Sequence, residues 1–249
     1  MKRSETFISL FLVVVAWQLA SYFFPVYLFP PVNLIGAELL ALIVDQQGYQ
    51  ALSTFARILA GMAGAFIFGG FLAFLMGRSD LFNRLVYPVV NLLQGVPALS
   101  WVVIAIIWFR HTEFRIWFIM VATTLPAFTF QLLDSYRAIS KDLMEMTLSF
   151  RPSRLDYLRV LVLPTVVPGI LTAWKVNLGN ASRVVVVAEL VGATSGIGYQ
   201  LLQSQQLFNL AAAIAWTITL VVFVLITQSI LIVIENRVLR YRATSERGL

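Results

Sequence analysis

The sequence contains no cysteine and a single histidine, His111. A disulfide framework, a thiol nucleophile and a thiolate metal site are therefore excluded, and so is a histidine-rich metal site. Charged residues are also scarce: they make up 12% of the 249 residues, against about 25% in a typical soluble domain. Because so few charges cannot cover the surface of a water-soluble particle, the composition indicates an integral membrane protein.

What the sequence does have is long apolar runs, since 59% of its residues are hydrophobic. A helix needs about 20 mostly apolar residues to cross a bilayer. We therefore expect a single all-α domain over residues 1–249 with six transmembrane helices. The expected spans are residues 7–24, 51–77, 85–109, 116–136, 166–191 and 207–234.

The first of these runs has an alternative interpretation, because Lys2 and Arg3 resemble the start of a cleaved signal peptide. The run is longer than the usual 7–15 residues of a signal peptide's apolar region, so we expect it to be retained. After Pro30-Pro31, residues 33–44 are apolar but too short to span, which favours a helix along the interface. Residues 192–206, rich in Gly, Ser and Gln, are expected to form a loop.

Two spans carry internal signals. Gly61, Ala65 and Gly69 recur every four residues in the second span, and small residues in such a row let two membrane helices approach closely. The third span is interrupted at Gln94–Pro97, where Pro97 removes a backbone donor. This break is interpreted either as a simple kink or as part of the lining of a translocation path.

The basic residues are distributed unequally between the two faces that six spans would define. One face has only Arg110 and Arg115, and three further cations, Arg57, Lys175 and Arg183, fall within apolar runs. The other face collects Lys2, Arg3, Arg78, Arg84, Arg137, Lys141, Arg151, Arg154, Arg159, Arg237, Arg240, Arg242 and Arg247. The positive-inside rule makes this second face cytoplasmic, together with both termini. The net charge of +6 therefore indicates membrane topology and not a nucleic-acid surface.

Residues 184–198, VVVVAELVGATSGIG, resemble a strand followed by the glycine-rich turn of short-chain dehydrogenases. In that fold the turn opens the first βαβ unit, whereas here 183 residues precede it. Tyr199 is followed four residues later by Gln203 and not by lysine. The chain also lacks any GxxxxGK[ST] phosphate loop, so it does not itself bind and hydrolyse ATP in that way.

The charged segment Glu145–Pro164, EMTLSFRPSRLDYLRVLVLP, interrupts the apolar chain on the predicted cytoplasmic face. Its spacing resembles the EAA–G–I-LP loop of bacterial ABC importer permeases. Glu145, Leu163 and Pro164 match the motif, whereas Met146 and Thr147 replace the two alanines. Arg151 replaces the glycine, and Leu161 replaces the isoleucine.

The resemblance extends over nearly the whole chain and points to the nitrate/sulfonate/taurine importer permeases. LFPPVNLIGAELLAL at residues 28–42, Arg57 with Ala60-Gly61, and VPALSW at residues 96–101 look like segments of that family. Ala188-Glu189 followed by SGIGY at residues 195–199 looks like its AE…SGIGY signature, which also accounts for the dehydrogenase-like turn.

This resemblance implies a type I ABC importer permease in the bacterial inner membrane, a transport subunit and not an enzyme. It implies a small solute, an organic or inorganic anion of the nitrate, sulfonate/taurine or bicarbonate type, delivered by an external substrate-binding protein. The partners implied are two ATPase subunits, which would bind ATP and Mg, and a second permease copy. This chain itself would hold no cofactor and no metal.

Within that fold the loop 137–165 would couple the permease to the ATPases. We expect short helices at residues 139–150 and 153–161, separated by Arg151-Pro152, with Arg151 held extended by the following proline. The residues assigned to coupling are Glu145, Met146, Thr147, Arg151, Pro152, Ser153, Arg154, Asp156, Leu163 and Pro164.

The candidate translocation path is Gln94, Pro97, Trp101, Asn180, Ser182, Arg183 and Glu189. An ionisable group at bilayer depth costs at least ~2.5–3.5 kcal/mol, so Lys175 and Arg183 each need a partner or a water-filled cavity. Either Lys175 extends to the cytoplasmic end and Arg183 pairs with a carboxylate such as Glu189, or Arg183 gives the path a positive lining for an anion. A secondary transporter or channel is the alternative function; it predicts a midplane ionisable relay and internal repeats, and neither is visible in the sequence.

Overall fold

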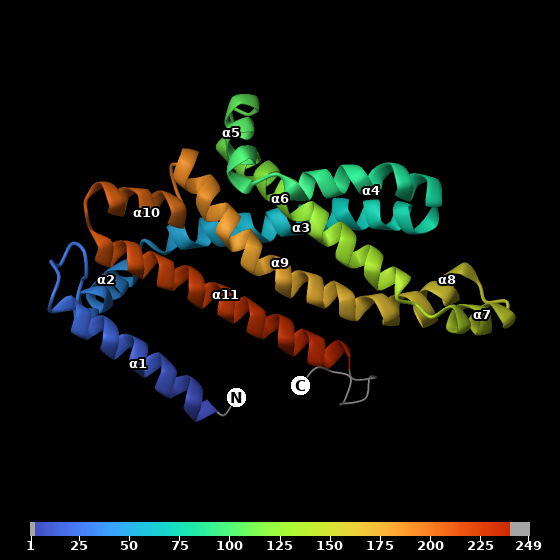
Figure 1. The fold of residues 1–249 in the computed structure, drawn as a ribbon, viewed down its shortest axis with the longest axis horizontal. Helices are drawn as coiled ribbons and strands as arrows, with labels where there is room; N and C mark the ends of the chain where they lie inside the picture. Colours follow the sequence, from blue (N-terminus) through green and yellow to red (C-terminus); the bar gives the residue numbers. More distant parts are fainter. Residues whose placement is uncertain (1–2, 240–249) are drawn as a thin grey trace. The chain divides into compact units, whose positions relative to one another are not determined.

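The computed structural model describes residues 3–239, without the side chains of residues 3, 4, 6, 7 and 154. Within this range every regular element is a helix, which confirms the all-α prediction (Figure 1). The elements are α1 (Arg3–Ser21), α2 (Val32–Val44), α3 (Gly48–Arg78), α4 (Asp80–Gly95), α5 (Ala98–Trp108), α6 (Thr112–Arg137), α7 (Lys141–Ser149), α8 (Arg154–Tyr157), the π-helical turn η1 (Leu158–Val162), α9 (Leu163–Gly192), α10 (Ile197–Gln206) and α11 (Leu210–Val238).

Among residues 3–239, four continuous helical segments are long and apolar enough to cross a membrane: Gly48–Arg78, Thr112–Arg137, Leu155–Gly192 and Leu210–Val238. The pair α4 and α5 makes a fifth if it is taken as one broken span. The predicted first span corresponds to α1, whose apolar part, Ile8–Ser21, is shorter than the other spans. The six-span topology therefore remains a prediction at its N-terminal end.

The chain divides into two compact units, Met1–Phe55 with Glu189–Phe223, and Ala56–Ala188 with Val224–Leu249. In the first unit Ala51, Ile197 and Trp216 form the buried core, and the rings of Phe55 and Phe223 stack with their centroids 3.8 Å apart. This unit contains all of α10 and the first parts of α3 and α11. Its core therefore holds the start of α10 against α3.

The N-terminal corner of the first unit is also held by side chains. The indole Nε1–H of Trp17 donates to the carbonyl of Pro30 at 2.9 Å. The Gln18 Oε1 atom accepts the backbone N–H of Val32 at 2.9 Å, in the first turn of α2. Because Pro31 offers no side-chain cap, Gln18 satisfies an N–H group that would otherwise lack a partner. The predicted short helix at residues 33–44 is confirmed as α2.

In the second unit α3 packs against α6 through the predicted row of small residues. A Cβ atom on Gly61 would lie 2.5 Å from the Cβ of Met120, and one on Gly69 would lie 3.0 Å from the carbonyl oxygen of Leu125. Ala65, between them, is fully buried. Glycine is therefore needed at residues 61 and 69, because a larger side chain there would push α3 and α6 apart. Rows of small residues allow such close contacts between membrane helices.

A cluster of three aromatic side chains extends this core to α9. Phe128 of α6 is fully buried, and its ring centroid lies 5.7 Å from that of Phe66 and 5.8 Å from that of Trp174. These edge-to-face arrangements are favourable ones for aromatic rings. Phe128 thereby ties α3, α6 and α9 together at one level.

The break predicted at Gln94–Pro97 is confirmed. α4 ends at Gly95, α5 begins at Ala98, and the two helices are bent by 97°. Pro97 is the residue before the first helical position of α5, where its missing N–H costs nothing. Both α4 and α5 contact α6 (Figure 1).

The prediction of a loop over residues 192–206 is wrong for its last 10 residues, Ile197–Gln206, which form α10. Gly is confined to residues 192–198, whereas the YQLLQSQQ that follows contains residues that tolerate a helix well. The dehydrogenase interpretation also fails, because residues 184–192 continue α9 and form no strand.

Candidate functional site

The segment between α6 and α9 forms two short helices, α7 and α8, with the predicted break at Arg151-Pro152. The second helix was predicted to end at residue 161, whereas it continues through η1 into α9. Ser153 begins α8: its Oγ accepts the backbone N–H of Asp156 at 3.2 Å and donates to the Asp156 carboxylate at 2.6 Å. The serine hydroxyl thus caps the start of α8, as serine commonly does at a helix N-terminus. The segment is therefore an ordered helix–turn–helix.

Arg151 does not have the extended backbone that was predicted for it. Its φ is 47°, in the left-handed region. Its N–H donates to the carbonyl of Leu148 at 3.0 Å, and the N–H of Phe150 donates to that of Thr147 at 3.2 Å. A residue in the left-handed conformation ends α7 here, and the N–H groups of Phe150 and Arg151 bond to carbonyls of its last turn. Glycine is the usual residue at such a position. Arg151 thus adopts a left-handed conformation that glycine usually supplies, at a cost of about 1–2 kcal/mol.

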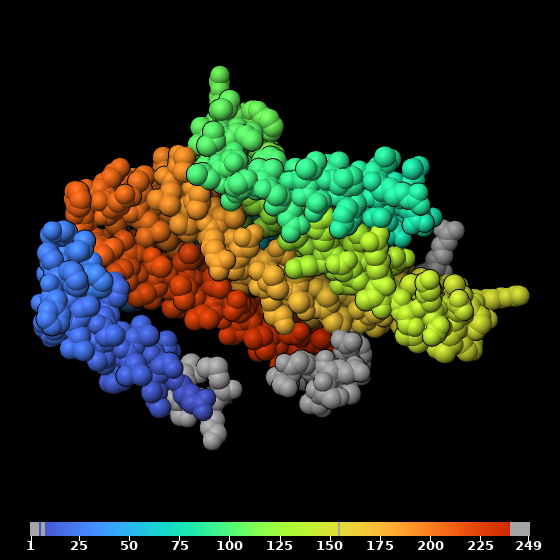
Figure 2. Space-filling view, viewed as in Figure 1, coloured from blue at the N-terminus to red at the C-terminus, as the bar shows by residue number. Residues whose placement is uncertain are grey.

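This segment exposes large apolar side chains next to its charged ones, although it lies between two spans. The fraction of the side chain that is exposed reaches 79% for Phe150, 71% for Val160, 56% for Met146 and 53% for Leu155. In the space-filling view α7 and α8 form a protruding knob (Figure 2). Apolar groups gathered on such a knob mark an interaction surface. We call these four residues the knob surface.

The other assigned coupling residues are also accessible. Glu145 is exposed and makes no hydrogen bond or ion pair with any described residue. Thr147 is half-buried, and its hydroxyl donates to the carbonyl of Leu143 at 2.7 Å. Leu163 is exposed and Pro164 half-buried at the start of α9. Arg154 lies in α8, and its side chain is outside the described residues.

The knob is joined to α9 without a loop, through the π-helical turn η1. Leu161 of this turn is buried, and both α7 and α8 contact the turn. Pro164 explains the irregularity: in a regular α-helix its ring would clash with the carbonyl of Val160, and a wider turn relieves that contact. A single helical element therefore runs from Leu155, in the second short helix, to Gly192 at the end of the long span.

The predicted path residues on α9 separate into two faces. Thr172, Val176, Asn180 and Arg183 are exposed and follow each other at spacings of four, four and three residues, which places them on one helix face. We call this face the α9 stripe. Ser182 lies off it, 3% exposed, with its hydroxyl donating to the Leu178 carbonyl at 2.8 Å.

Arg183 forms no hydrogen bond or ion pair with any residue in the range 3–239. Lys175, in contrast, donates to the Glu235 carboxylate of α11 at 2.6 Å, and both groups are partly buried. The two cations of this span thus differ: Lys175 is neutralised within its unit, and Arg183 is left on the α9 stripe.

At the α4–α5 break, Gln94 and Pro97 are exposed. Trp101, one turn further on, is half-buried, and its ring meets that of Phe118 at a centroid distance of 6.0 Å. The indole Nε1 of Trp101 is buried and has no hydrogen-bond partner among the described residues. A donor left in this way is available to a polar group outside the chain.

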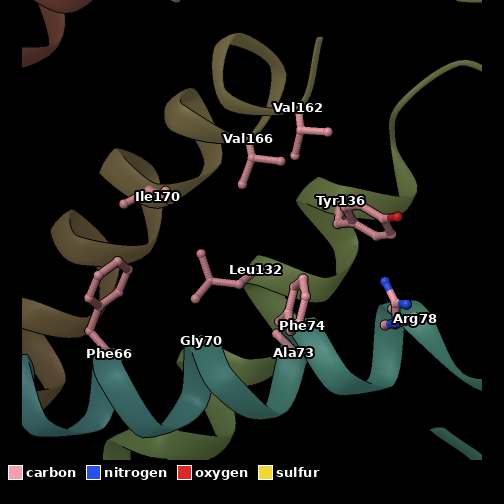
Figure 3. A pocket seen from close by; sticks show the side chains of 11 residues that line it. Phe66, Gly70, Ala73, Phe74, Arg78, Leu132, Tyr136, Val162, Val166 and Ile170 are labelled. Atoms are coloured by element: carbon pink, nitrogen blue, oxygen red, sulfur yellow. The ribbon is translucent and has the colours of Figure 1, made fainter. Parts of the chain in front are cut away.

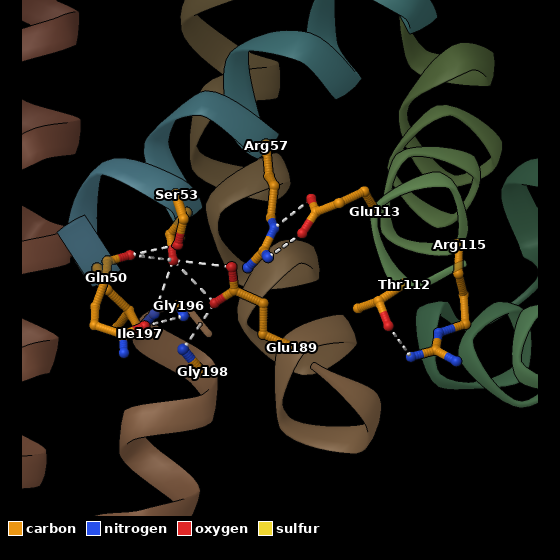
Figure 4. Close-up of polar contacts among 11 residues, drawn as sticks. Gln50, Ser53, Arg57, Thr112, Glu113, Arg115, Glu189, Gly196, Ile197 and Gly198 are labelled. Atoms are coloured by element: carbon orange, nitrogen blue, oxygen red, sulfur yellow. Dashed lines mark hydrogen bonds and ion pairs between the residues drawn. The ribbon is translucent and has the colours of Figure 1, made fainter. Parts of the chain in front are cut away.

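Glu189, near the end of α9, is fully buried beside the start of α10. Its Oε2 accepts the backbone N–H of Gly198 at 2.8 Å, and Thr54 Oγ1 lies 2.9 Å from Oε1 (Figure 4). The same Thr54 oxygen accepts the N–H of Ile197 at 2.8 Å. The two side chains therefore satisfy the first N–H groups of α10, and the carboxylate charge suits a helix N-terminus.

Gln50 completes this N-terminal cap of α10: its Oε1 accepts the N–H of Gly196 at 2.6 Å (Figure 4). Gly196 has a φ of 108°, and a Cβ atom there would lie 2.5 Å from the Cδ of Glu189. Both the backbone and the space thus require glycine. Gln50 and Thr54, one turn apart in α3, were not among the predicted site residues, although two polar residues near the start of an apolar span were a visible signal.

The second unit holds a bidentate ion pair between α3 and α6. Arg57, 8% exposed, donates from Nε to Glu113 Oε2 at 2.9 Å and from Nη2 to Oε1 (Figure 4). Paired donors of this kind fix orientation as well as charge. The pair joins α3 to the first turn of α6, and it accounts for one of the three cations found within apolar runs.

These features can be compared with known proteins. Residues 65–240 match the family described as the binding-protein-dependent transport system inner membrane component. The chain belongs to this family. The family match covers part of the glycine row of α3, the knob, the α9 stripe and all of α10 and α11.

Among curated relatives, the taurine transport system permease protein TauC of Escherichia coli (strain K12) is 28% identical over 198 residues, 76% of this chain and 71% of that one. The putative aliphatic sulfonates transport permease protein SsuC of Bacillus subtilis is 26% identical over 200 residues, 80% of this chain and 72% of that one. The nitrate import permease protein NrtB of Leptolyngbya laminosa is 28% identical over 151 residues, 61% of this chain and 54% of that one. The relatives are permease subunits, which are not enzymes themselves.

A solved structure of the MetNI methionine ABC transporter in an inward facing conformation is 16% identical and has a TM-score of 0.58, covering 79% of this chain and 98% of the matched chain. At this identity the likeness shows the fold, that of a type I ABC importer permease. The family resemblance stated from the sequence is confirmed.

Proposed function

We propose that the chain is a permease subunit of an ATP-driven importer in the inner membrane and that it carries a small oxyanion delivered by an external binding protein. Two ATPase subunits and a second permease copy would complete the transporter. The observation that carries the ATP-driven part is the knob surface, an exposed apolar surface that continues without a loop into a spanning helix. A motor outside the membrane needs such an element to tilt helices inside it.

The knob surface also explains why the partner would be a protein. Phe150 and Val160 stand in a segment that also bears Arg151, Asp156 and Arg159, so it is too charged to insert into lipid. A protein groove can cover the apolar groups and leave the charges at its rim. Glu145, exposed and unpaired within the described residues, is positioned to meet a basic group there.

The docking test compares two phenylalanines with the same exposure. Phe150 and Phe208 are each 79% exposed, the first in the knob surface and the second between α10 and α11. The permease is co-expressed with its cognate ATPase subunit and purified through a tag on the permease. Phe150→Asp and Glu145→Ala are expected to reduce recovery of the ATPase about tenfold, which corresponds to about 1.4 kcal/mol. Phe208→Asp should retain it.

Membrane insertion of each variant is measured as the amount of tagged permease in washed membranes. Normal ATPase recovery with both Phe150→Asp and Glu145→Ala, at normal insertion, would exclude the knob as the docking element.

The anion part of the proposal rests on Arg183. Its guanidinium is exposed on a mainly apolar span and has no partner in residues 3–239, so burial in lipid would cost several kcal/mol. A water-filled path beside the α9 stripe removes that cost, and Asn180 adds a hydrogen-bonding group on the same face. Nitrate, taurine, sulfonates and bicarbonate, the solutes in the names of the relatives, each carry an oxyanion group that an arginine can bind.

The substrate test measures uptake of nitrate, taurine, an alkanesulfonate and bicarbonate in cells that contain the complete transporter. For the solute that the wild type carries, Arg183→Ala should lower uptake about tenfold or more, and Arg183→Lys should restore part of it. Arg84→Ala, which removes an exposed arginine near the start of α4, is the matched control. Uptake unchanged in Arg183→Ala would refute the role of Arg183.

A further inference from the structure

The second unit contains a cavity of about 430 Å³ bounded by α3, α6 and the beginning of α9 (Figure 3). This volume lies in the range of about 300–1,000 Å³ that is typical of small-molecule sites. Apolar side chains, among them Phe66, Leu132 and Ile170, form most of its lining. A cavity with such a lining does not hold ordered water, since water needs two to four polar partners.

The cavity exists because α3 has small residues at this level. Gly70 and Ala73 lie opposite Leu132, and a Cβ atom on Gly70 would approach Leu132 Cδ1 only to 3.5 Å, an ordinary contact. At Gly61 and Gly69, in contrast, atoms of α6 already occupy the space that a Cβ atom would need. At Gly70 the chain therefore leaves space that no side chain occupies, and this is not a position where helix packing requires glycine.

The two polar groups of the cavity lie together at one end. Figure 3 shows the Arg78 guanidinium and the Tyr136 ring on one side of the cavity, with Phe66 and Ile170 on the other. Arg78 is exposed, and neither Arg78 nor the Tyr136 hydroxyl forms a hydrogen bond or ion pair with a described residue. The lining thus joins a long apolar wall to two free hydrogen-bond donors, one of them cationic.

The helix ends locate the cavity at one face of the membrane. Arg78 is the last residue of α3, Tyr136 precedes the last residue of α6, and Val166 is in the first turn of α9. All three positions are on the side of the knob, which the charge distribution predicts to be cytoplasmic. From Phe66 to Arg78 the helix rises about 18 Å at 1.5 Å per residue, so the cavity reaches from the interface into the apolar core of the leaflet.

We propose that this cavity binds one anionic phospholipid from the leaflet on the knob side. An acyl chain lies between Phe66 and Ile170, and the headgroup phosphate accepts hydrogen bonds from Arg78 and Tyr136. The charge at the mouth argues for an anionic lipid, because arginine pairs with phosphate and the cytoplasmic leaflet is the one rich in anionic headgroups. The bound chain contacts Val162 and Val166 at the junction of the knob and α9.

The test counts lipids that remain bound to the purified full chain by native mass spectrometry in detergent. Phosphatidylglycerol, phosphatidylethanolamine and inorganic phosphate are added separately over the same concentration range. The wild type should retain one phosphatidylglycerol at a concentration about tenfold below that needed for phosphatidylethanolamine, and it should show no retained phosphate. Arg78→Gln should remove the preference for phosphatidylglycerol.

Gly70→Leu fills the cavity and should remove tight binding of both lipids. Two variants serve as controls: Arg84→Gln removes an exposed arginine outside the cavity, and Gly36→Leu adds a leucine to α2 at a glycine with open space around it. Both should bind as the wild type does. The proposal is overturned if Gly70→Leu binds phosphatidylglycerol normally, if the two lipids bind equally to the wild type, or if free phosphate is retained instead. The measurement needs no ATPase and no transport, so its outcome is independent of the proposed function.

Discussion

The carboxylate of Glu189 and the backbone N–H of Gly198 lie 2.8 Å apart and join the end of α9 to the start of α10. A charged group in a fully buried place is costly unless it is hydrogen-bonded, and here the N–H of Gly198 and the hydroxyl of Thr54 supply those bonds. The AE…SGIGY pattern is thus explained physically: the acid caps the helix, and Gly196 makes room for the acid.

Removing the hydroxyl of Thr54 is expected to destabilise the protein. Thr54→Val keeps the shape of the side chain but leaves the N–H of Ile197 without its acceptor, at a cost of about 1–3 kcal/mol. The measurement is the unfolding temperature of the purified permease in detergent. Thr217→Val is the control, because the Thr217 hydroxyl is exposed and bonds only to the carbonyl of Ala213 in its own helix. Equal unfolding temperatures for the two variants would show that the Thr54 bond adds no stability.

Two glycines should respond in opposite ways to alanine. Gly196→Ala forces an alanine to a φ of 108° and places its Cβ 2.5 Å from Glu189 Cδ, so a clear fall in the unfolding temperature is expected. Gly179 is inside α9, and a Cβ atom added there would have no neighbouring atom within 4 Å. Gly179→Ala should therefore leave stability unchanged or raise it by about 0.5–1 kcal/mol. The same thermal assay decides, and tolerance of Gly196→Ala would contradict the cap geometry.

Substitutions of Arg151 can distinguish the role of its left-handed backbone from the role of its positive charge. Arg151→Gly removes the strain of a left-handed residue, so ATPase recovery and uptake should remain at wild-type level or rise. Arg151→Val is expected to lower both several-fold, because a β-branched residue is disfavoured at positive φ. If Arg151→Gly lowers ATPase recovery and uptake as much as Arg151→Val does, the guanidinium itself is required at the docking surface.

The ion pair between Lys175 and Glu235 is expected to hold α11 against α9. Lys175→Met or Glu235→Gln alone should cost about 1.5–3 kcal/mol, since each leaves a partly buried charge without its partner. The exchange Lys175→Glu with Glu235→Lys should recover most of the lost stability. Unfolding temperatures of the wild type, the two single variants and the double variant Lys175→Met with Glu235→Gln give the coupling between the two residues. An exchange variant no more stable than the single variants would contradict a specific pair.

The helices themselves were predictable because apolar runs and their breakers are local. The run over residues 51–77 became α3, and Gly95 and Pro97 mark the bend between α4 and α5, since proline acts on its own neighbours. The row Gly61, Ala65, Gly69 predicted a close helix contact, but the sequence could not show that α6 is the helix that fills it.

The errors came from distant residues in one case and from competing local preferences in another. Residues 197–206 look like a loop until Gln50 and Thr54, in the first turns of α3, cap them as a helix. Pro152 favours an extended residue before it, but the capping of α7 outweighs this local preference at Arg151. The roles of Asn180 and Arg183 depend on what covers the α9 stripe, which no pattern within this one chain specifies.

The π-helical turn at Leu158–Val162 has a further consequence. A π-turn holds one residue more than an α-turn, and an α-helix advances about 1.5 Å and turns about 100° for each residue. The surplus residue therefore changes, relative to an uninterrupted α-helix, which way the knob faces around the axis of α9. The direction in which the knob presents its exposed apolar side chains is thus set by this one turn.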